Sequence, residues 1–307
     1  MRFPNISDAM RLERLEPPTG KVRMVLDTDT YNEIDDQFAV VYAMLSPGHL
    51  DVEALYAAPF SNRGTADPAD GMEKSYEELL RLLNRLGISP DGFVFRGSTR
   101  YQVDWKHPER SEAAIDLVSR AMAAHDDPLY VIAIGAITNV ASAILLQPEI
   151  IERIVIVWLG GQPLHWPSAK HFNLGQDFYA SRLVFDCGVP LVHIPCTTVA
   201  SHLLTTVPEM ELYVRGQGAV GDYLFEILKA YVEQRSALSK EIWDISAIAY
   251  LINDDWVPTE LVHSPILTDQ MTWSTAHSRH FIRQATFVER DPIFRDLFTK
   301  LRTCAAA

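Results

Sequence analysis

Short apolar runs alternate with amphipathic segments from residue 22 to about residue 205. Runs rich in β-branched residues and apolar at nearly every position predict strands that are covered on both faces. They lie at residues 22–27, 52–58, 93–95, 130–134, 154–159 and 191–194. Between them, apolar residues recur at the spacing of one helix face. These segments are 36–45, 71–86, 111–125, 138–146 and 177–187. The alternation predicts a largely parallel sheet with helices on both faces.

The last hundred residues follow a different pattern, with helical segments in succession and then two weaker strand candidates before a terminal helix. The helical segments are 210–216, 221–234 and 242–252, and the strand candidates are 261–264 and 280–288. The polar start, residues 1–20 with Pro17, Pro18 and Gly20, is typical of an arm. No repeat or linker divides the chain. We therefore expect a single domain, residues 1–307, of the α/β class, built on an open, mostly parallel sheet.

The charge balance argues against several classes of partner. The chain has 27 basic and 40 acidic residues, which give a formal net charge of -13 at pH 7. No basic stripe is present to bind a nucleic-acid backbone or an anionic membrane surface. No segment reaches the ~18–20 consecutive apolar residues of a membrane span. The acidic excess fits a protein that acts on small neutral molecules or holds a cation, although a solvated acidic surface explains it equally well.

The cysteines bear on the cellular compartment. Cys187, Cys196 and Cys304 are scattered and odd in number, which argues against both a disulfide framework and a zinc site. The first twenty residues also lack the continuous apolar stretch of a secretory signal. We therefore expect a cytoplasmic protein.

Four aspartates gather in residues 24–45, MVLDTDTYNEIDDQFAVVYAML. Asp27 and Asp29 end the first predicted strand and point to the same side, while Asp35 and Asp36 begin the next helix. In open α/β sheets this edge is where ligands bind. A helix N-cap explains one member of the pair, but four converging carboxylates repel one another unless a cation lies among them. The segment therefore predicts a metal site.

Two known sequence patterns begin in this way. One is the DxDxT signature of Mg²⁺-dependent phosphatases, but Tyr31 stands where that signature has threonine. The other is the DxDPGxDD motif of the nucleoside hydrolase family, which the segment resembles much more closely. Here five residues, 30–34, separate Asp29 from the Asp-Asp pair instead of three, and the Pro-Gly is absent. The longer loop places Tyr31, Asn32 and Glu33 near the expected site and indicates a divergent branch of the family.

Further segments resemble the same family, and they occur in the same order. Residues 130–141, YVIAIGAITNVA, are similar to its strand-turn-helix with a GPLTN-like sequence. This resemblance implies that the backbone carbonyl of Ile134 ligates calcium. Taken alone, the segment is an ordinary buried strand followed by a helix. Residues 157–190 are similar to the family's GG…EFN…D…A…GIP segment.

Three candidate sugar contacts lie in the second of these segments. Asn173 matches the family asparagine that hydrogen-bonds the sugar hydroxyls, His171 replaces a glutamate, and His165 corresponds by a loose alignment to another asparagine. Both histidines are explained equally well as exposed loop residues. A weaker match at residues 58–63, APFSNR, makes Asn62 a further candidate sugar contact.

Residues 241–253, EIWDISAIAYLIN, resemble the family's C-terminal helix with its His-Asp pair. Asp244 matches the aspartate, a calcium ligand. Trp243 stands in place of the histidine that protonates the leaving base in many members, and an indole N–H does not titrate at neutral pH. Trp243 therefore either stacks on an aromatic leaving group or belongs to the core, and the sequence leaves both open.

The resemblance runs from about residue 22 to residue 290 and implies a nucleoside hydrolase-like fold with a Rossmann-like core. It implies hydrolysis of the N-glycosidic bond of a ribonucleoside or a related N-riboside, in a homodimer or homotetramer. The implied Ca²⁺ ligands are Asp29, Asp36, Asp244 and the carbonyl of Ile134. Asp29 would also be the general base, Asp35 would hydrogen-bond a sugar hydroxyl, and Asp27 would orient the groups that touch the metal.

The sequence leaves the activation of the leaving group open. Candidate acids are His165, His171, His202 and Tyr223, and none is supported by its spacing. Alternatively, the base needs no proton because it is already cationic, as nicotinamide is. Two other functions also remain: a calcium-dependent sugar- or nucleoside-binding relative with altered or lost hydrolase activity, and a hydrolase of a non-nucleoside glycoside.

Overall fold

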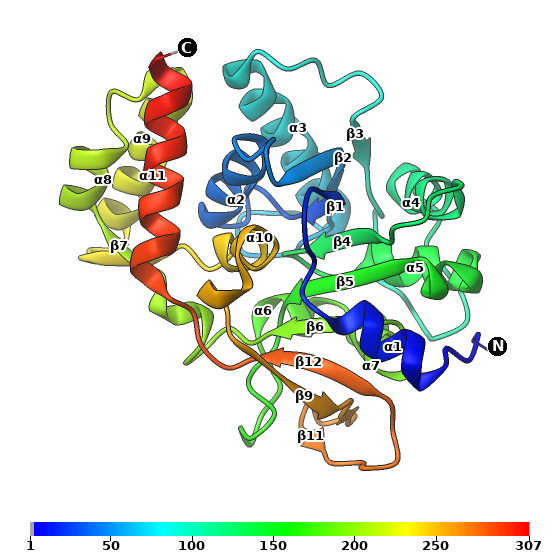
Figure 1. The fold of residues 1–307 in the computed structure, drawn as a ribbon. Coiled ribbons are helices and arrows are strands. Elements are labelled where there is room, and N and C mark those ends of the chain that lie inside the picture. Colours follow the sequence, from blue (N-terminus) through cyan, green and yellow to red (C-terminus); the bar gives the residue numbers. More distant parts are fainter. Residues whose placement is uncertain (1–2, 307) are drawn as a thin grey trace.

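Eight strands form the central sheet of the computed structural model, which describes residues 3–306 (Figure 1). Their order across the sheet is β3-β2-β1-β4-β5-β6-β12-β9. They are β1 Val22–Thr28, β2 Leu50–Ala57, β3 Val94–Arg96, β4 Leu129–Ala133, β5 Ile154–Leu159, β6 Leu191–Ile194, β9 Thr259–His263 and β12 Phe281–Ala285. All neighbours run parallel except β9, which is antiparallel to β12. The expected open, mostly parallel α/β sheet is confirmed.

The middle strands are covered on both faces. Every residue of β4 and β5 is buried, in keeping with their uninterrupted apolar sequence. β1 pairs with β2 on one side and with β4 on the other, so that Asp27 lies opposite Tyr56 and Ala133. Because these strands are parallel neighbours, their carboxyl ends meet at one edge of the sheet.

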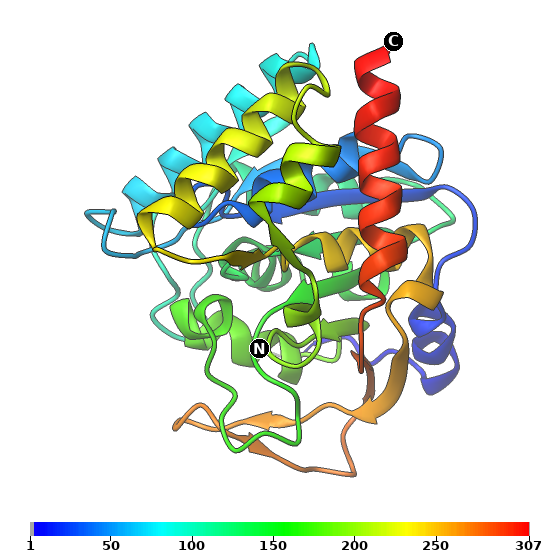
Figure 2. The same ribbon diagram turned by 90° about the vertical axis from the view of Figure 1, so that its left-hand side faces the viewer.

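Helices enclose the sheet from both sides, as Figures 1 and 2 show. The helices are α1 Asp8–Leu15, α2 Asp35–Met44, α3 Pro68–Leu86, α4 Glu112–Met122, α5 Thr138–Leu146, α6 Phe172–Gln176, α7 Phe178–Asp186, α8 Val207–Tyr213, α9 Gly218–Gln234, α10 Ile245–Ile252 and α11 Arg290–Ala306. Residues of α4, α5 and α7 form one apolar core against the sheet, and residues of α2, α3 and α10 form the other. α9 and α11 extend this second core, and α9 lies beside α3 (Figure 2).

Helix α3 shows how local sequence sets the elements near the sheet edge. The side chain of Asp67 accepts a hydrogen bond from the amide of Asp70, and Pro68 occupies the first turn, where its missing N–H costs nothing. Gly87 ends the helix with φ +70°, a left-handed conformation that glycine adopts without strain. The helix therefore starts at a fixed place beside the loop that follows β2.

The N-terminal arm, residues 1–20, differs from expectation because it contains helix α1. Leu15 is fully buried, and Arg11 donates a hydrogen bond of 2.6 Å to the carbonyl of Gly188. The side chain of Ser7 caps the helix by accepting from the amide of Met10. The polar composition concealed an amphipathic helix that packs against β12.

Other differences concern very short elements. The predicted helix at 177–187 is α7, and a separate short helix, α6, precedes it. Two ribbons were not predicted: β7 Leu204–Thr206 pairs with β8 Ser239–Glu241, and β10 Ile266–Leu267 pairs with β11 Trp273–Ser274. Strands of two or three residues offer too few positions for an alternating pattern to be recognised.

Within residues 3–306, none of the helices combines the length and the apolar character needed to cross a membrane. Cys187 and Cys196 are buried and free, and Cys304 is exposed and free.

Candidate active site

A cavity of about 650 Å³ opens at the carboxyl ends of β1, β4 and β5. Asp29, Ile134 and Leu159 stand at or just beyond the ends of these three strands and line it. The start of α2, the start of α6 and the segment before α10 complete the inner wall. This volume lies within the range of small-molecule sites.

Most of the residues expected at the site line this cavity. They are Asp29, Asp35, Asp36, Asn62, Ile134, His171, Asn173, Trp243 and Asp244. Tyr31, Asn32 and Glu33 of the longer loop line it too, as expected. Asp27 is fully buried behind the wall. His165 is exposed and is not part of the cavity wall. The structure therefore does not place it at the expected sugar site.

Four buried carboxylates converge at the floor of the cavity. Asp29 follows β1, Asp35 and Asp36 form the first turn of α2, and Asp244 precedes α10. Carboxylate oxygens of Asp35, Asp36 and Asp244 lie within 4.8 Å of one another. Helices α2 and α10 pack together, which is why residues more than two hundred positions apart meet here.

The electrostatics of this cluster favour a bound cation. Burial raises the pKa of Asp29 and of Asp244 well above the usual range, and the neighbouring carboxylates raise both further. Burial and the charge of Asp35 raise the pKa of Asp36 to about 7. The buried Oδ2 atom of Asp29 has no hydrogen-bond partner among the described residues. Clustered buried oxygen ligands of this kind fit a hard divalent cation, which would restore the ionised forms.

Ile134, whose carbonyl is the expected backbone ligand, follows β4 and lines the same cavity as the carboxylates. Its carbonyl oxygen accepts a hydrogen bond of 2.7 Å from the Nδ2 of Asn173. Asn173 also donates to the carbonyl of Leu159 at 2.9 Å. The Asn173 amide therefore ties the ends of β4 and β5 together, and its Oδ1 is left for another partner.

Gly135 lets the chain after β4 pass close to Asp29. A Cβ at this position would lie 2.7 Å from Oδ1 and 3.0 Å from Cγ of Asp29, closer than such atoms approach. We expect Gly135→Ala to displace the Asp29 carboxylate and to weaken the binding of a divalent cation about 10- to 100-fold, as the loss of a supporting contact at a metal ligand does. Titration calorimetry with Ca²⁺ measures this affinity.

The matched control is Gly175→Ala in α6, where a Cβ would meet only the Cγ of Lys170, at 3.9 Å. This variant should bind the cation as the unchanged protein does. Equal affinities for the two variants would show that Gly135 does not constrain Asp29.

Asn139 holds Asp27 in place behind the cluster, and sequence reasoning missed it. Its Nδ2 donates to Asp27 Oδ1 at 2.8 Å, and its Oδ1 accepts from the amide of Ser98 at 2.7 Å. Burial raises the pKa of Asp27 to about 7. The signal was present, because Asn139 is the asparagine of the ITN sequence at the start of α5. Within the cluster itself, the Thr28 hydroxyl donates a hydrogen bond of 2.5 Å to Asp36 Oδ1.

The longer loop between Asp29 and Asp35 forms one side of the cavity mouth. Tyr31 has φ +112°, an uncommon conformation for a residue with a side chain, and its side chain is exposed. Asn32 Oδ1 accepts a hydrogen bond of 2.9 Å from Asn62 Nδ2. This contact joins the loop to the segment after β2.

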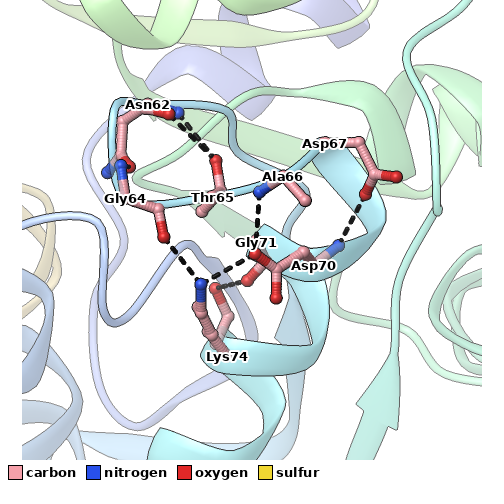
Figure 3. A network of polar contacts seen from close by, with 9 residues as sticks. Asn62, Gly64, Thr65, Ala66, Asp67, Asp70, Gly71 and Lys74 are labelled. Atoms are coloured by element: carbon pink, nitrogen blue, oxygen red, sulfur yellow. Dashed lines mark hydrogen bonds and ion pairs between the residues drawn. The ribbon is translucent and has the colours of Figure 1, made fainter.

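The segment that carries Asn62 is internally braced (Figure 3). Asn62 Oδ1 accepts a hydrogen bond of 2.7 Å from the backbone N–H of Gly64, and the backbone N–H of Asn62 donates to Thr65 Oγ1 at 2.9 Å. Lys74 of α3 donates to the carbonyl of Gly64 at 2.7 Å and pairs with Asp70 at 2.7 Å. Asn62 is thus fixed at the cavity wall by contacts to two loops.

A buried lysine in the cavity wall was not anticipated. Lys240, in β8, has a side chain that is 4% exposed and pairs with Glu33 at 2.7 Å and with Asp35 at 3.8 Å. Burial disfavours its charged form, but Asp35 and Glu33 outweigh this effect and raise the pKa of Lys240. Arg63 and Arg235 also line the cavity, but both are exposed. No motif includes Lys240, so the sequence offered no signal for it.

Aromatic side chains occupy the wall near Lys240. Trp243 and His171 lie edge to face with ring centroids 5.9 Å apart, and both line the cavity. Burial lowers the pKa of His171 to about 4, so this ring is neutral at pH 7. His202 and Tyr223, which were candidate acids, do not line the cavity.

Comparisons with known proteins agree with this geometry. The family model for inosine-uridine preferring nucleoside hydrolase matches residues 24–291. A putative pyrimidine-specific ribonucleoside hydrolase, RihB of Shigella boydii, is 32% identical over 180 residues, which cover 55% of this chain and 70% of that protein. For the pyrimidine-specific ribonucleoside hydrolase RihB of Escherichia coli K12, identity is 31% over 180 residues, 55% of this chain and 54% of the relative.

Solved structures share the fold over most of the chain. The purine-preferring ribonucleoside hydrolase from Gardnerella vaginalis superimposes with a TM-score of 0.76 at 19% identity, covering 92% of this chain and 99% of that chain. The segment of similar sequence spans about half to two thirds of the length of most of the curated relatives. The similarity of the fold, in contrast, extends over almost the whole of both chains.

Proposed function

Because the chain belongs to the inosine-uridine preferring nucleoside hydrolase family, we propose that it hydrolyses the N-glycosidic bond of ribonucleosides or related N-ribosides. The observation that carries the proposal is the set of buried carboxylates at the floor of a cavity large enough for a nucleoside. The cavity combines these acidic groups with aromatic residues on its wall, as the recognition of a sugar and a planar base requires.

Members of this family are metal-dependent, and we propose Ca²⁺ as the metal of this protein. The ligands would be Asp29, Asp36, Asp244 and the carbonyl of Ile134, which all line the same cavity. Support comes from the all-oxygen donor set and from the unpartnered Oδ2 of Asp29. A bound divalent cation lowers the pKa of a water molecule that it ligates and binds vicinal hydroxyls.

Asp29 is the proposed general base. Its carboxylate is buried and faces the cavity, where a water molecule can lie between it and a bound sugar. The water oxygen forms the new bond to the anomeric carbon, one water proton passes to Asp29, and the electron pair of the broken C–N bond leaves with the base. The acidic surroundings also stabilise the positive charge that develops on the sugar ring.

The sugar is held by polar groups around the cluster. We propose that Asp35 accepts a hydrogen bond from a sugar hydroxyl, and that Asn173, with its Oδ1 available, accepts from another. His171 and Asn62 stand at the cavity wall within the same site. Trp243 is half-buried and lines the cavity, which supports stacking on the base over a purely structural role.

Incubation of the purified protein with Ca²⁺ and a panel of purine and pyrimidine ribonucleosides tests the proposal. We expect equal amounts of free base and ribose, measured by chromatography and a reducing-sugar assay. Both base classes are needed, because the similar proteins named above include pyrimidine-specific and purine-preferring enzymes.

The alternative is a relative that binds a sugar or nucleoside without cleaving it, or one that cleaves another glycoside. It is favoured by the replacement of two family residues by His171 and Trp243. Binding of Ca²⁺ without release of base or reducing sugar from any nucleoside or glycoside would establish the non-catalytic function. Release of sugar from glycosides alone would establish the other.

We also propose that the protein is located in the cytoplasm and forms a homodimer or a homotetramer. The three free cysteines support a reducing compartment, and the resemblance to the family supports the oligomer. Light scattering of the purified protein measures its mass against the 34.6 kDa of one chain.

A further inference from the structure

We propose that Lys240 stabilises the negative charge that develops on the departing base, and that the substrates are therefore nucleosides of a neutral base rather than of a cationic one. This inference rests on the proposed hydrolase function. It assigns the leaving-group role to a residue outside every motif described above, and it selects between the two kinds of leaving group that the sequence left open.

Lys240 lies beside the aromatic residues of the cavity wall against which we expect the base to bind. Its Nζ is 5.9 Å from the centre of the Trp243 ring and 5.4 Å from the centre of the Tyr231 ring, and all three residues line the cavity. Both rings belong to the aromatic part of the wall, which can stack on a planar base. Asp35, the proposed sugar contact, is 3.8 Å from the same Nζ. The ammonium therefore lies between the expected positions of sugar and base.

Other candidates for this role are less suitable. His171 is neutral at pH 7 because burial lowers its pKa to about 4. The side chain of Lys74 is 32% exposed, against 4% for Lys240, so that water screens the charge of Lys74 more strongly. Arg63 and Arg235 are exposed to solvent at the mouth, where water screens their charge. Among the described residues of the wall, Lys240 is the buried cation.

The longer loop holds Lys240 in place. Glu33 pairs with its Nζ at 2.7 Å and accepts a hydrogen bond of 2.9 Å from Tyr231. An ammonium has three N–H donors, and the two carboxylates near Lys240 occupy at most two of them. At least one donor is therefore left for a ligand. A fixed cation in a buried site stabilises developing negative charge more than the same cation does in water.

The charge of the leaving base decides whether Lys240 favours or disfavours the cleavage. When the bond between the anomeric carbon and the base nitrogen breaks, its electron pair stays on the nitrogen, and a neutral base leaves as an anion that takes up a proton afterwards. Lys240 stabilises this anion. A cationic base such as nicotinamide leaves as a neutral molecule, so the same ammonium repels it in the ground state and gains nothing as it departs.

Two substrates that differ in leaving group test the role. Uridine has a poor leaving group, whereas p-nitrophenyl β-D-ribofuranoside releases a stable phenolate and needs little stabilisation. We expect Lys240→Met to lower kcat for uridine on the order of 100-fold and kcat for the p-nitrophenyl riboside by less than about threefold. Lys240→Arg, which keeps the charge, should recover most of the activity on uridine. The control is Lys229→Met in α9, outside the cavity wall.

A second measurement uses the unchanged protein and so does not depend on the folding of a variant. We expect kcat/KM for nicotinamide riboside to be at least tenfold below that for uridine, although nicotinamide is chemically the better leaving group. A higher value for nicotinamide riboside, or equal losses of Lys240→Met on both substrates, would overturn the proposal. If the unchanged protein cleaves none of the three ribosides and no purine ribonucleoside either, the proposed function itself fails.

Discussion

We expect the replacement of Asp29 by alanine to reduce kcat for hydrolysis by at least about a thousandfold. The expected loss is large because the variant removes two contributions at once. A general base contributes ~10²–10⁴-fold, and Asp29 is also a proposed ligand of the metal. Steady-state assays on the best nucleoside of the panel, with Ca²⁺ in excess, measure the effect. Asp29→Asn keeps the shape of the side chain and should be almost as inactive, because an amide cannot accept the proton.

The control for this substitution is Asp255→Asn, an exposed aspartate in the turn after α10. It should leave kcat unchanged. A circular dichroism spectrum and a melting curve show whether each variant folds. A folded Asp29→Ala protein that retains a tenth or more of the activity would mean that another group accepts the proton.

Removal of the metal is expected to have the second large effect. Treatment with a chelator should abolish hydrolysis and lower the melting temperature by several degrees at pH 8, because Asp29, Asp36 and Asp244 then repel one another in a buried site. Added Ca²⁺ should restore both. Activity that persists after chelation would contradict the assignment of the metal site.

The metal-free protein should also lose stability as the pH rises. Burial raises the folded-state pKa of Asp27 and Asp36 to about 7, from 3.8 in an unperturbed side chain. Between these two values the folded state binds more protons than the unfolded state, so the free energy of unfolding falls by up to about 1.4 kcal/mol per pH unit for each carboxylate. The decrease ends above pH 7, where both are ionised in either state.

Melting curves of chelated protein from pH 5 to pH 8 test this sign. The melting temperature should be highest near pH 5, and the gain from Ca²⁺ should be largest near pH 8, because the cation binds the ionised carboxylates. A chelated protein whose melting temperature rises from pH 5 to pH 8 would show that these carboxylates are not destabilised by burial.

Much of the fold could be predicted from the sequence, because the strands that matter most are long and buried. The predicted bounds of β5 and α5 are the observed ones, since β5 is apolar throughout, α5 is mostly apolar, and each ends at a polar residue or a turn. The floor of the site was also predictable, because Asp27, Asp29, Asp35 and Asp36 are close in sequence and mark the end of a strand and the start of a helix. Asp244 required the family resemblance, because only the packing of α10 on α2 brings it there.

The part of the cavity wall formed by the longer loop and β8 could not be predicted in the same way. Lys240 lies in a three-residue strand with no periodic pattern, and its partner Glu33 lies in a loop whose path depends on the unusual backbone of Tyr31. His165 is exposed outside the cavity wall, in keeping with the alternative of an exposed loop residue, because spacing alone does not fix the side to which a loop turns a residue. Side chains that meet through tertiary packing leave no local signal in the sequence.

The ion pair between Glu33 and Lys240 has an evolutionary consequence. Glu33 is available only because five residues separate Asp29 from Asp35. In a homologue with the shorter loop, a lysine at this place in β8 would lose its nearest counter-ion and would be buried at a cost of several kcal/mol. A glutamate alone on the longer loop would be harmless, since it is partly exposed. We therefore expect related chains that have a buried lysine at this place in β8 to have the longer loop with its glutamate as well.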